Sequence, residues 1–336
     1  MVIADPVNLR YLANCYVDPF SLGADFGGIL AIRPDGYATL YHDSRLPKTV
    51  EASHVDERKV TIWYDGKRGE WGARRLALLD SLKQIGGRIH DSLPDPLGAE
   101  VQTTIAQMRR QKDPDEIEML KTCMTVGEQG QNWARANAKA GMSELEVYCG
   151  IFQACSLAAG HAVILYGDFA VSPGPSRKGG PPTKQIIKDG DMLILDFSVI
   201  ISGYRSDYTN TLVIGGKPTP EQQRLYDCCK LAMAAGERTL KAGNTCLSVY
   251  NATREAFAKE GMAEHFPHHA GHGLGLGHPE APFLVKEATE TLLEGDVVTL
   301  EPGLYVDGIG GIRIEHNYLI TKTGYEQLSH HEIRLV

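Results

Sequence analysis

The sequence predicts an α+β protein of two domains, a smaller α/β domain followed by a larger domain that contains an internal repeat. The length of 336 residues is about twice that of an average domain. Strand-like and helix-like apolar patterns follow one another through the N-terminal third of the chain. Farther along, a ten-residue segment recurs with six identical residues, which indicates a duplicated unit.

Composition and charge exclude several classes of protein. Apolar residues make up 43% and charged residues 23%, as is typical of globular domains. The 34 Lys and Arg against 42 Asp and Glu give a net charge of −8, so we expect no nucleic-acid partner. No apolar run reaches about 18 residues, so we expect no membrane span. The N-terminus lacks a signal-peptide pattern and the seven cysteines form no CxxC pair, which predicts a cytoplasmic protein with reduced cysteines.

Three segments of the first domain have predicted secondary structure. Residues 27–43 form two strand-like runs around Pro34-Asp35-Gly36, which has the composition of a hairpin turn. A further short strand is predicted at Val60–Tyr64. Apolar residues at helical spacing predict a helix over Glu70–Ile85, which Gly86 should end.

A polar segment over residues 108–116 separates the two predicted domains. Within it Asp113 precedes Pro114, and an Asp cap followed by proline is typical of a helix start. We therefore place the domains at residues 1–107 and 108–336.

The repeat in the second domain pairs Lys139–Tyr148 with Lys241–Tyr250. Each copy has a glycine that should end one helix, followed by Ser143 or Thr245 as the N-cap of the next helix. Ser143 and Glu146 have the spacing of a capping box. A helix that begins with proline is also predicted upstream of each copy, so we expect two helix–helix units, each followed by strands.

Two carboxylates follow each unit at matching positions. The segment GDMLILD ends in Asp196 and GDVVTLE ends in Glu301, so an apolar strand is expected to end in an acid in both copies. The segment GYRSD then ends in Asp207, and GIRIE ends in Glu315. The four acids thus lie on four strand segments that a predicted internal pseudo-two-fold relates.

These acids have two explanations. Any one of them alone resembles the solvated acid that often ends a strand. However, Asp196, Glu301 and Glu315 lie in or beside apolar runs, where an unpaired charge is costly. Four acids brought together by symmetry also repel one another unless cations hold them. The pattern therefore predicts a divalent metal site, and an oxygen-rich ligand set suits Mn²⁺, Fe²⁺, Co²⁺ or Zn²⁺.

Glycine is in excess, with 36 residues, and it is concentrated in the segment HHAGHGLGLGHPEAP. This segment is not a dinucleotide-binding loop, because Leu276 stands where GxGxxG needs its third glycine, and it is not an HExxH motif. The glycines on either side of His272 let the backbone approach the imidazole closely. Beside four symmetric acids, His272 is predicted to be the nitrogen ligand.

The chain from about residue 108 to its C-terminus resembles the pita-bread metallopeptidases, which include methionine aminopeptidase, proline aminopeptidase, prolidase and creatinase. The motifs LILDFSVIISGYRSDYTNTLVIGG, HHAGHGLGL, TLEPGLY and GIRIEHNYLIT carry the resemblance. It implies a C-terminal pita-bread fold with an internal pseudo-two-fold. Residues 1–107, which include NLRYLAN, are similar to the N-terminal α/β domain of the prolidase and creatinase branch.

The resemblance implies a centre of two divalent metal ions, Mn, Co, Zn or Fe. Asp207 and Glu315 would bridge the ions, with Asp196 on one ion and His272 and Glu301 on the other. A metal-bridging hydroxide would attack the scissile amide, and the ions would stabilise the oxyanion. In the same way, the predicted catalytic residues are His268, His278 and Glu301, and the predicted substrate-binding residues include His268 and Arg313.

The sequence departs from the family pattern in the loop at residues 172–185. This loop lacks the usual substrate-facing histidine, which His161 or Tyr166 could replace, and we include Tyr166 among the predicted substrate-binding residues. Two further departures are Ser198, where the family usually has glycine, and Asn210, where it usually has arginine.

A histidine is also shifted. The other catalytic histidine of the family lies seven residues after the metal-ligating one, but that position is Pro279 here and the histidine is His278. The complete ligand set predicts a metal, and the lost loop histidine predicts altered substrate handling.

These observations lead to three functional hypotheses. The first is an Xaa-Pro peptidase, similar to prolidase or proline aminopeptidase, that cleaves short peptides. The second keeps the fold and acts on a small non-peptide substrate, as a creatinase-like C–N hydrolase or a lyase. The third is a binding module without catalysis, because fold alone does not fix function. The resemblance also implies a homodimer.

Overall fold

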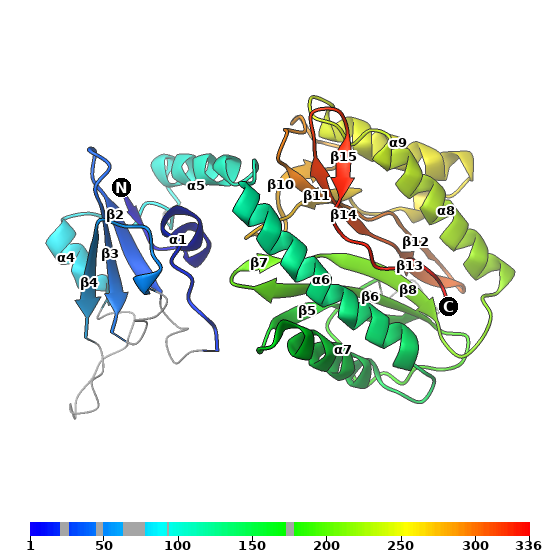
Figure 1. Cartoon of the computed structure of the whole chain (residues 1–336). Helices are drawn as coiled ribbons and strands as arrows, with labels where there is room; N and C mark the ends of the chain where they lie inside the picture. Colours follow the sequence, from blue (N-terminus) through cyan, green and yellow to red (C-terminus); the bar gives the residue numbers. More distant parts are fainter. Residues whose placement is uncertain (21–26, 45–49, 63–77, 93, 173–177) are drawn as a thin grey trace. The chain divides into compact units, whose positions relative to one another are not determined.

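The computed structural model describes residues 1–20, 27–44, 50–62, 78–92, 94–172 and 178–336 (Figure 1). The chain divides into two compact units, Met1–Arg109 and Arg110–Val336. Of the predicted features, the end of the strand at 60–64, residues 70–77 of the following helix and residues 173–177 of the glycine- and proline-rich loop lie outside the described residues.

The first unit contains a four-stranded sheet in the order β1-β2-β3-β4. Its strands are Val2–Ile3, Gly28–Ile32, Ala38–Asp43 and Glu57–Thr61. The antiparallel pairing of β2 with β3 confirms the hairpin around Pro34-Asp35-Gly36. Strand β4 runs parallel to β3 and begins at Glu57, so the predicted start at Val60 was wrong. The apolar pattern missed Glu57-Arg58-Lys59 because charged side chains are common on an edge strand.

The described helices of the first unit are α1 (Pro6–Ala13), α4 (Ser81–Ile85) and α5 (Pro96–Met108). Helix α4 ends at Gly86, which has a left-handed backbone conformation, as predicted. Helices α1 and α5 were not predicted from the sequence. Both begin at an Asp-Pro pair, and the Asp5 carboxylate accepts hydrogen bonds from the backbone N–H groups of Val7 and Asn8. This Asp-Pro pair was the available signal.

The second unit consists of two similar halves. The first half contains α6 (Pro114–Asn137), α7 (Glu144–Ala159), β5 (Ile164–Ser172), β6 (Met192–Ile201), β7 (Tyr204–Arg205) and β8 (Tyr208–Val213). The second half contains α8 (Pro220–Glu237), α9 (Cys246–Lys259), a short 3-10 turn η1 (Ala263–His265), β9 (Gly271–Gly273), β10 (Glu280–Leu284), β11 (Val297–Leu300), β12 (Gly303–Val306), β13 (Gly310–Arg313), β14 (His316–Ile320) and β15 (Tyr325–Gln327). Each half is therefore a helix pair followed by antiparallel strands.

The predicted caps of the repeat are confirmed. Ser143 and Glu146 form a capping box at the start of α7, and the Thr245 hydroxyl caps α9. Each cap residue also forms a single β-bridge at the matching place, Ser143 with Ile186 and Thr245 with Thr291. The sequence predicted that the glycine of each repeat copy ends a helix, and this prediction was wrong. Helices α6 and α8 end several residues earlier, and both glycines form left-handed turns in the loops that follow.

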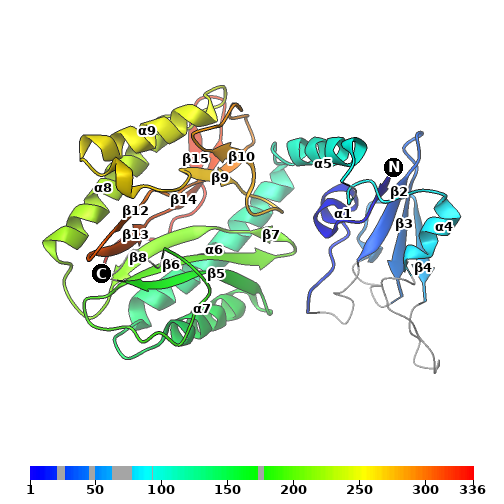
Figure 2. The same ribbon diagram turned by 180° about the vertical axis from the view of Figure 1, so that it is seen from behind.

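The helices of the second unit cover one face of its strands, as the opposite views in Figures 1 and 2 show. Phe197 of β6 lies on this face, because a Cβ atom on Gly130 of α6 would meet its ring at 3.0 Å. Neighbouring residues of a strand point to opposite faces, so Asp196 projects away from the helices. Thus the alternation along β6 sends an acid to the open face of the sheet.

The segment that follows β15 packs beside β8, and its His331 is buried. The Nε2 of His331 lies 3.3 Å from the Thr209 carbonyl oxygen, and its ring lies 4.7 Å from that of His316. The Nδ1 atom is buried without a hydrogen-bond partner among the described residues. Burial lowers the pKa of His331 to about 4, so the folded protein holds this imidazole neutral.

This burial predicts a loss of stability in acid. In the unfolded chain the His331 imidazole becomes protonated below a pH of about 6.5. In the folded chain it stays neutral until about pH 4. The free energy of unfolding should therefore fall as the pH drops through this window, and His331→Gln should remove up to about 3 kcal/mol of that fall. Urea unfolding of both proteins from pH 7.5 to 4.5, with chelator present, measures the difference. Equal slopes would contradict the prediction.

Candidate metal centre

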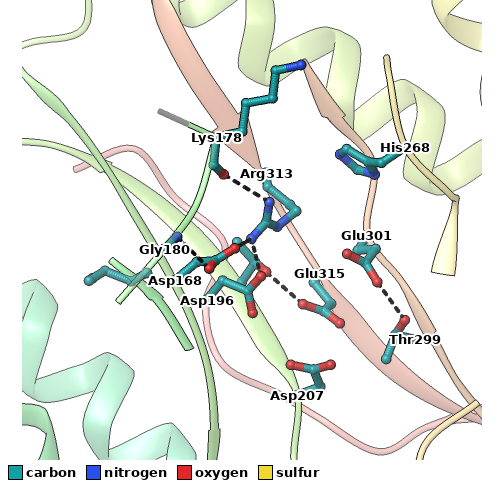
Figure 3. A network of polar contacts seen from close by, with 12 residues as sticks. Asp168, Lys178, Gly180, Asp196, Asp207, His268, Thr299, Glu301, Arg313 and Glu315 are labelled. Atoms are coloured by element: carbon teal, nitrogen blue, oxygen red, sulfur yellow. Dashed lines mark hydrogen bonds and ion pairs between the residues drawn. The ribbon is translucent and has the colours of Figure 1, made fainter. Parts of the chain in front are cut away.

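The strands of the two halves place the four predicted acids on one face. Asp196 lies in the middle of β6, Asp207 directly precedes β8, Glu301 directly follows β11, and Glu315 lies between β13 and β14. The prediction that an acid ends each apolar strand is correct for Glu301 and wrong for Asp196, because the apolar run FSVII continues the strand beyond it. In Figure 3 the four carboxylates point toward a common space.

Polar contacts join the two halves of the second unit at this space. The Thr209 hydroxyl donates to Glu315 Oε2 at 2.7 Å, and the Glu315 N–H donates to the Thr209 carbonyl. The Asn317 amide group holds the backbone of Asp207 on both sides, since it accepts from the N–H at 3.2 Å and donates to the carbonyl. The positions of Asp207 and Glu315 are therefore fixed by backbone and side-chain contacts together.

The structure brings the five predicted ligands together. Oxygen atoms of Asp196, Asp207 and Glu315 lie within 4.8 Å of one another. The Nε2 of His272 lies 3.6 Å from Asp207 Oδ2 and 3.4 Å from Glu301 Oε1. The His272 Nδ1 lies 2.9 Å from the Gly273 carbonyl, to which it donates, so Nε2 is the ring nitrogen that faces the acids.

The raised pKa values of Asp196 and Glu315 indicate that positive charge is in short supply beside these two acids. Burial, to which the charges of Asp207 and Glu301 add, raises the pKa of Asp196 to about 7 and that of Glu315 well above its usual range. Burial alone would raise the pKa of Asp207 as well, but His278 and His272 lower it. Glu315 Oε1 is buried without a hydrogen-bond partner among the described residues. Divalent cations fit such a donor set, because they would neutralise the acids and take up the free oxygen.

Arg313 is the buried cation of the cluster. Its guanidinium group donates to Asp196 and, at 2.9 Å, to Asp168 Oδ2 (Figure 3). It also donates to the Tyr305 hydroxyl at 2.8 Å and to the Lys178 carbonyl at 3.3 Å. Arg313, which was predicted to bind substrate, therefore holds Asp196 and the Lys178 carbonyl in the loop.

Asp168 of β5 was missed by the sequence reasoning. It lies opposite Asp196 in the β5–β6 pairing and accepts a hydrogen bond from the Gly180 N–H at 2.6 Å. A Cβ atom at Gly179 would lie 2.1 Å from the Asp168 carboxylate, so a larger residue there would displace this carboxylate from its present contacts. Asp168 and Arg313 thus fix residues 178–180, in the loop that lacks the usual histidine. The signal was an acid within the strand pattern ILYGDFAVS.

A cavity of about 560 Å³ opens beside the acids. Its walls combine aromatic, proline and acidic residues, Tyr148, Leu165, Tyr166, Gly167, Asp168, Pro181, Pro182, Asp196, Phe197, Ser198, Asp207 and His278. Of the two proposed replacements for the loop histidine, Tyr166 lines this cavity. His161 is exposed and is not among the lining residues.

His278 lies at the cavity and contacts the cluster directly. Its Nε2 lies 2.8 Å from Asp207 Oδ2, and its ring lies 5.0 Å from that of His272 and 5.8 Å from that of Tyr166. The Tyr166 hydroxyl accepts a hydrogen bond from the Arg205 guanidinium group at 2.7 Å. Arg205 was not selected from the sequence. Burial opposes a charge on His278, but the Asp207 carboxylate outweighs it and raises the pKa of His278.

His268 lies on the other side of the cluster, near Glu301. Its Nδ1 donates to the His269 carbonyl at 2.8 Å, so its Nε2 accepts from the Tyr305 hydroxyl at 3.2 Å. Burial lowers the pKa of His268 to about 4, which keeps the ring neutral. Neither His269 nor Tyr305 was given a role from the sequence, although both belong to the quoted motifs HHAGHGLGL and TLEPGLY.

The two departures from the family pattern take different positions. Ser198 lines the cavity with its hydroxyl 3.5 Å from Asp207 Oδ1. Asn210 makes two hydrogen bonds with the backbone of Arg334, so it holds the C-terminal segment and does not face the acids.

Fold and site agree with one known protein family. Residues 118–322 match the sequence model of metallopeptidase family M24, and the chain belongs to this family. The predicted family and its pita-bread fold are thereby confirmed. Among the helices that the structure describes, none has the length and apolar character needed to cross a membrane.

Similar proteins support the same family. An uncharacterized peptidase of Staphylococcus aureus strain USA300 is 32% identical over 238 residues, which are 69% of this chain and 66% of that protein, slightly less than two thirds of its length. The prolidase from Pyrococcus furiosus is 25% identical, with a TM-score of 0.81 over 98% of this chain and 96% of its own. The prolidase from Pyrococcus horikoshii is 26% identical, with a TM-score of 0.82 over 100% of this chain and 94% of its own.

Proposed function

We propose that the protein is an Xaa-Pro peptidase, similar to a prolidase or proline aminopeptidase, that uses two divalent metal ions. The observation that carries this proposal is the convergence of four acids and His272 beside a cavity. Its similarity to two prolidases over nearly the whole chain supports the substrate class.

The residues divide into two sets of ligands. Asp207 and Glu315 would contact both ions, Asp196 would bind one of them, and His272 and Glu301 would bind the other. Such ions supply Lewis-acid polarisation of the carbonyl group and a nucleophilic water of lowered pKa. Manganese, cobalt, zinc and iron all suit oxygen and imidazole ligands, so the donor set leaves the choice among them open.

The remaining polar residues orient this set. His278 holds one oxygen of Asp207, and Thr299 donates to Glu301 Oε1 at 3.0 Å. Arg313, the Tyr305 hydroxyl and His268 form a chain in which each group donates to the next, so His268 Nε2 is an acceptor in this state. We propose that His268 and His278 lie against the bound substrate, one on each side of the metal ions.

The cavity walls favour a small apolar residue of the substrate. Tyr148 and Tyr166 line the cavity together with Pro181 and Pro182. Such a wall suits a proline ring and excludes water from one side of the scissile bond.

A second candidate function is hydrolysis or elimination on a small non-peptide amide. One observation favours it. Residues 178–182 place two prolines and no imidazole at this wall, and their Lys178 carbonyl and Gly180 N–H are already bonded to Arg313 and Asp168. A substrate that needs no hydrogen bond from the loop would fit this arrangement.

A hydrolysis screen tests the proposal. Ala-Pro, Ala-Pro-Ala and the control peptide Ala-Ala are incubated with protein loaded with Mn²⁺, Co²⁺ or Zn²⁺. We expect release of alanine from the two Xaa-Pro peptides, lost with chelator, and at least about tenfold slower cleavage of Ala-Ala. A fully loaded protein that cleaves none of the peptides would overturn the peptidase proposal and favour the second candidate.

Two finer statements complete the proposal. All seven cysteines are free thiols, which supports a reducing compartment such as the cytoplasm. The homodimer is inferred from the family resemblance alone.

A further inference from the structure

His269 is a nitrogen donor beside the metal centre that has no assigned role. It lies between His268 and the strand that carries His272. Its Nδ1 atom is buried without a hydrogen-bond partner among the described residues and faces Glu301 Oε1 at 3.5 Å. A donor atom enclosed in this way is costly unless something binds it.

His269 and Glu301 belong to one group of possible metal ligands, and His272 contacts the same Glu301 oxygen. His272 Nε2 and His269 Nδ1 lie 3.4 Å and 3.5 Å from this oxygen, which is longer than an ordinary hydrogen bond of about 2.9 Å. Two atoms bound to one metal at about 2.1 Å and at a tetrahedral angle lie about 3.4 Å apart. Glu301 thus has a nitrogen atom at ligand spacing from each histidine.

His268 is a weaker candidate for this position, although its donor atoms also lie within 4.8 Å of His269 and Glu301. Both of its ring nitrogens have partners, the His269 carbonyl and the Tyr305 hydroxyl. His269 Nδ1 has none among the described residues, so the free nitrogen is the one on His269.

We propose that His269 Nδ1 is an additional ligand of the ion held by His272 and Glu301, and that it makes this position selective for Zn²⁺ or Co²⁺ over Mn²⁺. The inference rests on the proposed metal centre. Imidazole suits Zn²⁺ and Co²⁺, whereas Mn²⁺ favours carboxylate and carbonyl oxygen. A second imidazole on one ion therefore changes metal preference without adding charge to the cluster.

The variants His269→Ala and His269→Asn test this assignment. Alanine removes the donor, and the Asn Oδ1 takes the place of Nδ1 and exchanges nitrogen for oxygen. The His269 side chain is 39% exposed, so neither change opens the core. His161→Ala is the matched control, because His161 is exposed and lies outside the donor clusters.

The measurement is calorimetric titration of metal-free protein with Zn²⁺, Co²⁺ or Mn²⁺, together with the visible absorption of bound Co²⁺. We expect His269→Ala to weaken one Zn²⁺ and one Co²⁺ site by about 10- to 100-fold and to change the Co²⁺ spectrum. Mn²⁺ affinity should change less than about threefold, and His269→Asn should bind Mn²⁺ at least as well as wild type.

Unchanged Zn²⁺ binding and an unchanged Co²⁺ spectrum in His269→Ala would overturn the inference, as would an equal loss for all three ions. The titration contains no peptide, so its result is separate from that of the hydrolysis screen. If peptides are cleaved but His269→Ala keeps its Zn²⁺ affinity, only the role of His269 is contradicted. If no peptide is cleaved but Zn²⁺ affinity depends on His269, only the proposed peptidase activity is contradicted.

Discussion

Asp207→Asn should lower kcat/KM for Xaa-Pro peptides by about 10³-fold or more and remove high-affinity binding of at least one metal ion. Asp207 belongs to two donor groups, one with Asp196 and Glu315 and one with His272 and His278. It therefore faces the ligands proposed for both ions. Asparagine has nearly the same shape, but it lacks the negative charge and one of the two acceptor oxygens.

The fold should survive this substitution. Asn317 holds the backbone of Asp207, and both of those hydrogen bonds persist in the variant. Asp227→Asn, at an exposed position on α8, is the matched control and should behave as wild type. Peptide kinetics and metal titration of the three proteins measure the effect. An Asp207→Asn protein with wild-type turnover and metal affinity would contradict the proposed bridging position.

Arg313→Met should destabilise the metal-free protein by about 3–5 kcal/mol, because it removes the buried cation that Asp196 and Asp168 share. Asp196 would then lie among other acids without its strongest counter-charge. Divalent ions supply positive charge to the same cluster, so the loss should be smaller in metal-loaded protein.

Urea unfolding at pH 7.5, with chelator or with Mn²⁺, measures this difference. Arg313→Lys is the comparison, because it keeps the charge but lacks the second guanidinium nitrogen, which donates to the Tyr305 hydroxyl and the Lys178 carbonyl. We expect its stability to lie between wild type and Arg313→Met. Equal unfolding midpoints of Arg313→Met and wild type in chelator would show that Arg313 does not balance the acids.

The positions of the four acids were predictable because the repeat left a direct signal in the sequence. Asp196 and Glu301 follow matching Gly-Asp turns, and Asp207 and Glu315 close matching short segments. Symmetry within one chain thus identified acids that lie far apart in sequence but share one face of the sheets. The proline starts and hydroxyl caps of the helices were predictable for a local reason, since they depend on neighbouring residues only.

The residues that surround these acids were not predictable in this way. Asp168 acquires its position through strand pairing with β6 and through a loop that approaches it from farther along the chain. His269 and Tyr305 stand in recognisable motifs, but only the fold shows that they face Glu301 and Arg313. The charged start of β4 was missed because edge strands tolerate polar residues that hide their pattern.

The most direct test of the account is the number of metal ions that the folded protein binds. Native mass spectrometry of metal-free protein, after addition of Mn²⁺ or Zn²⁺ and removal of excess ions, gives this number. Five proposed ligands on two facing halves of the second unit predict two ions in each chain of the wild type. A folded chain that retains no divalent ion with either metal would contradict the account, because the converging acids would then have another explanation.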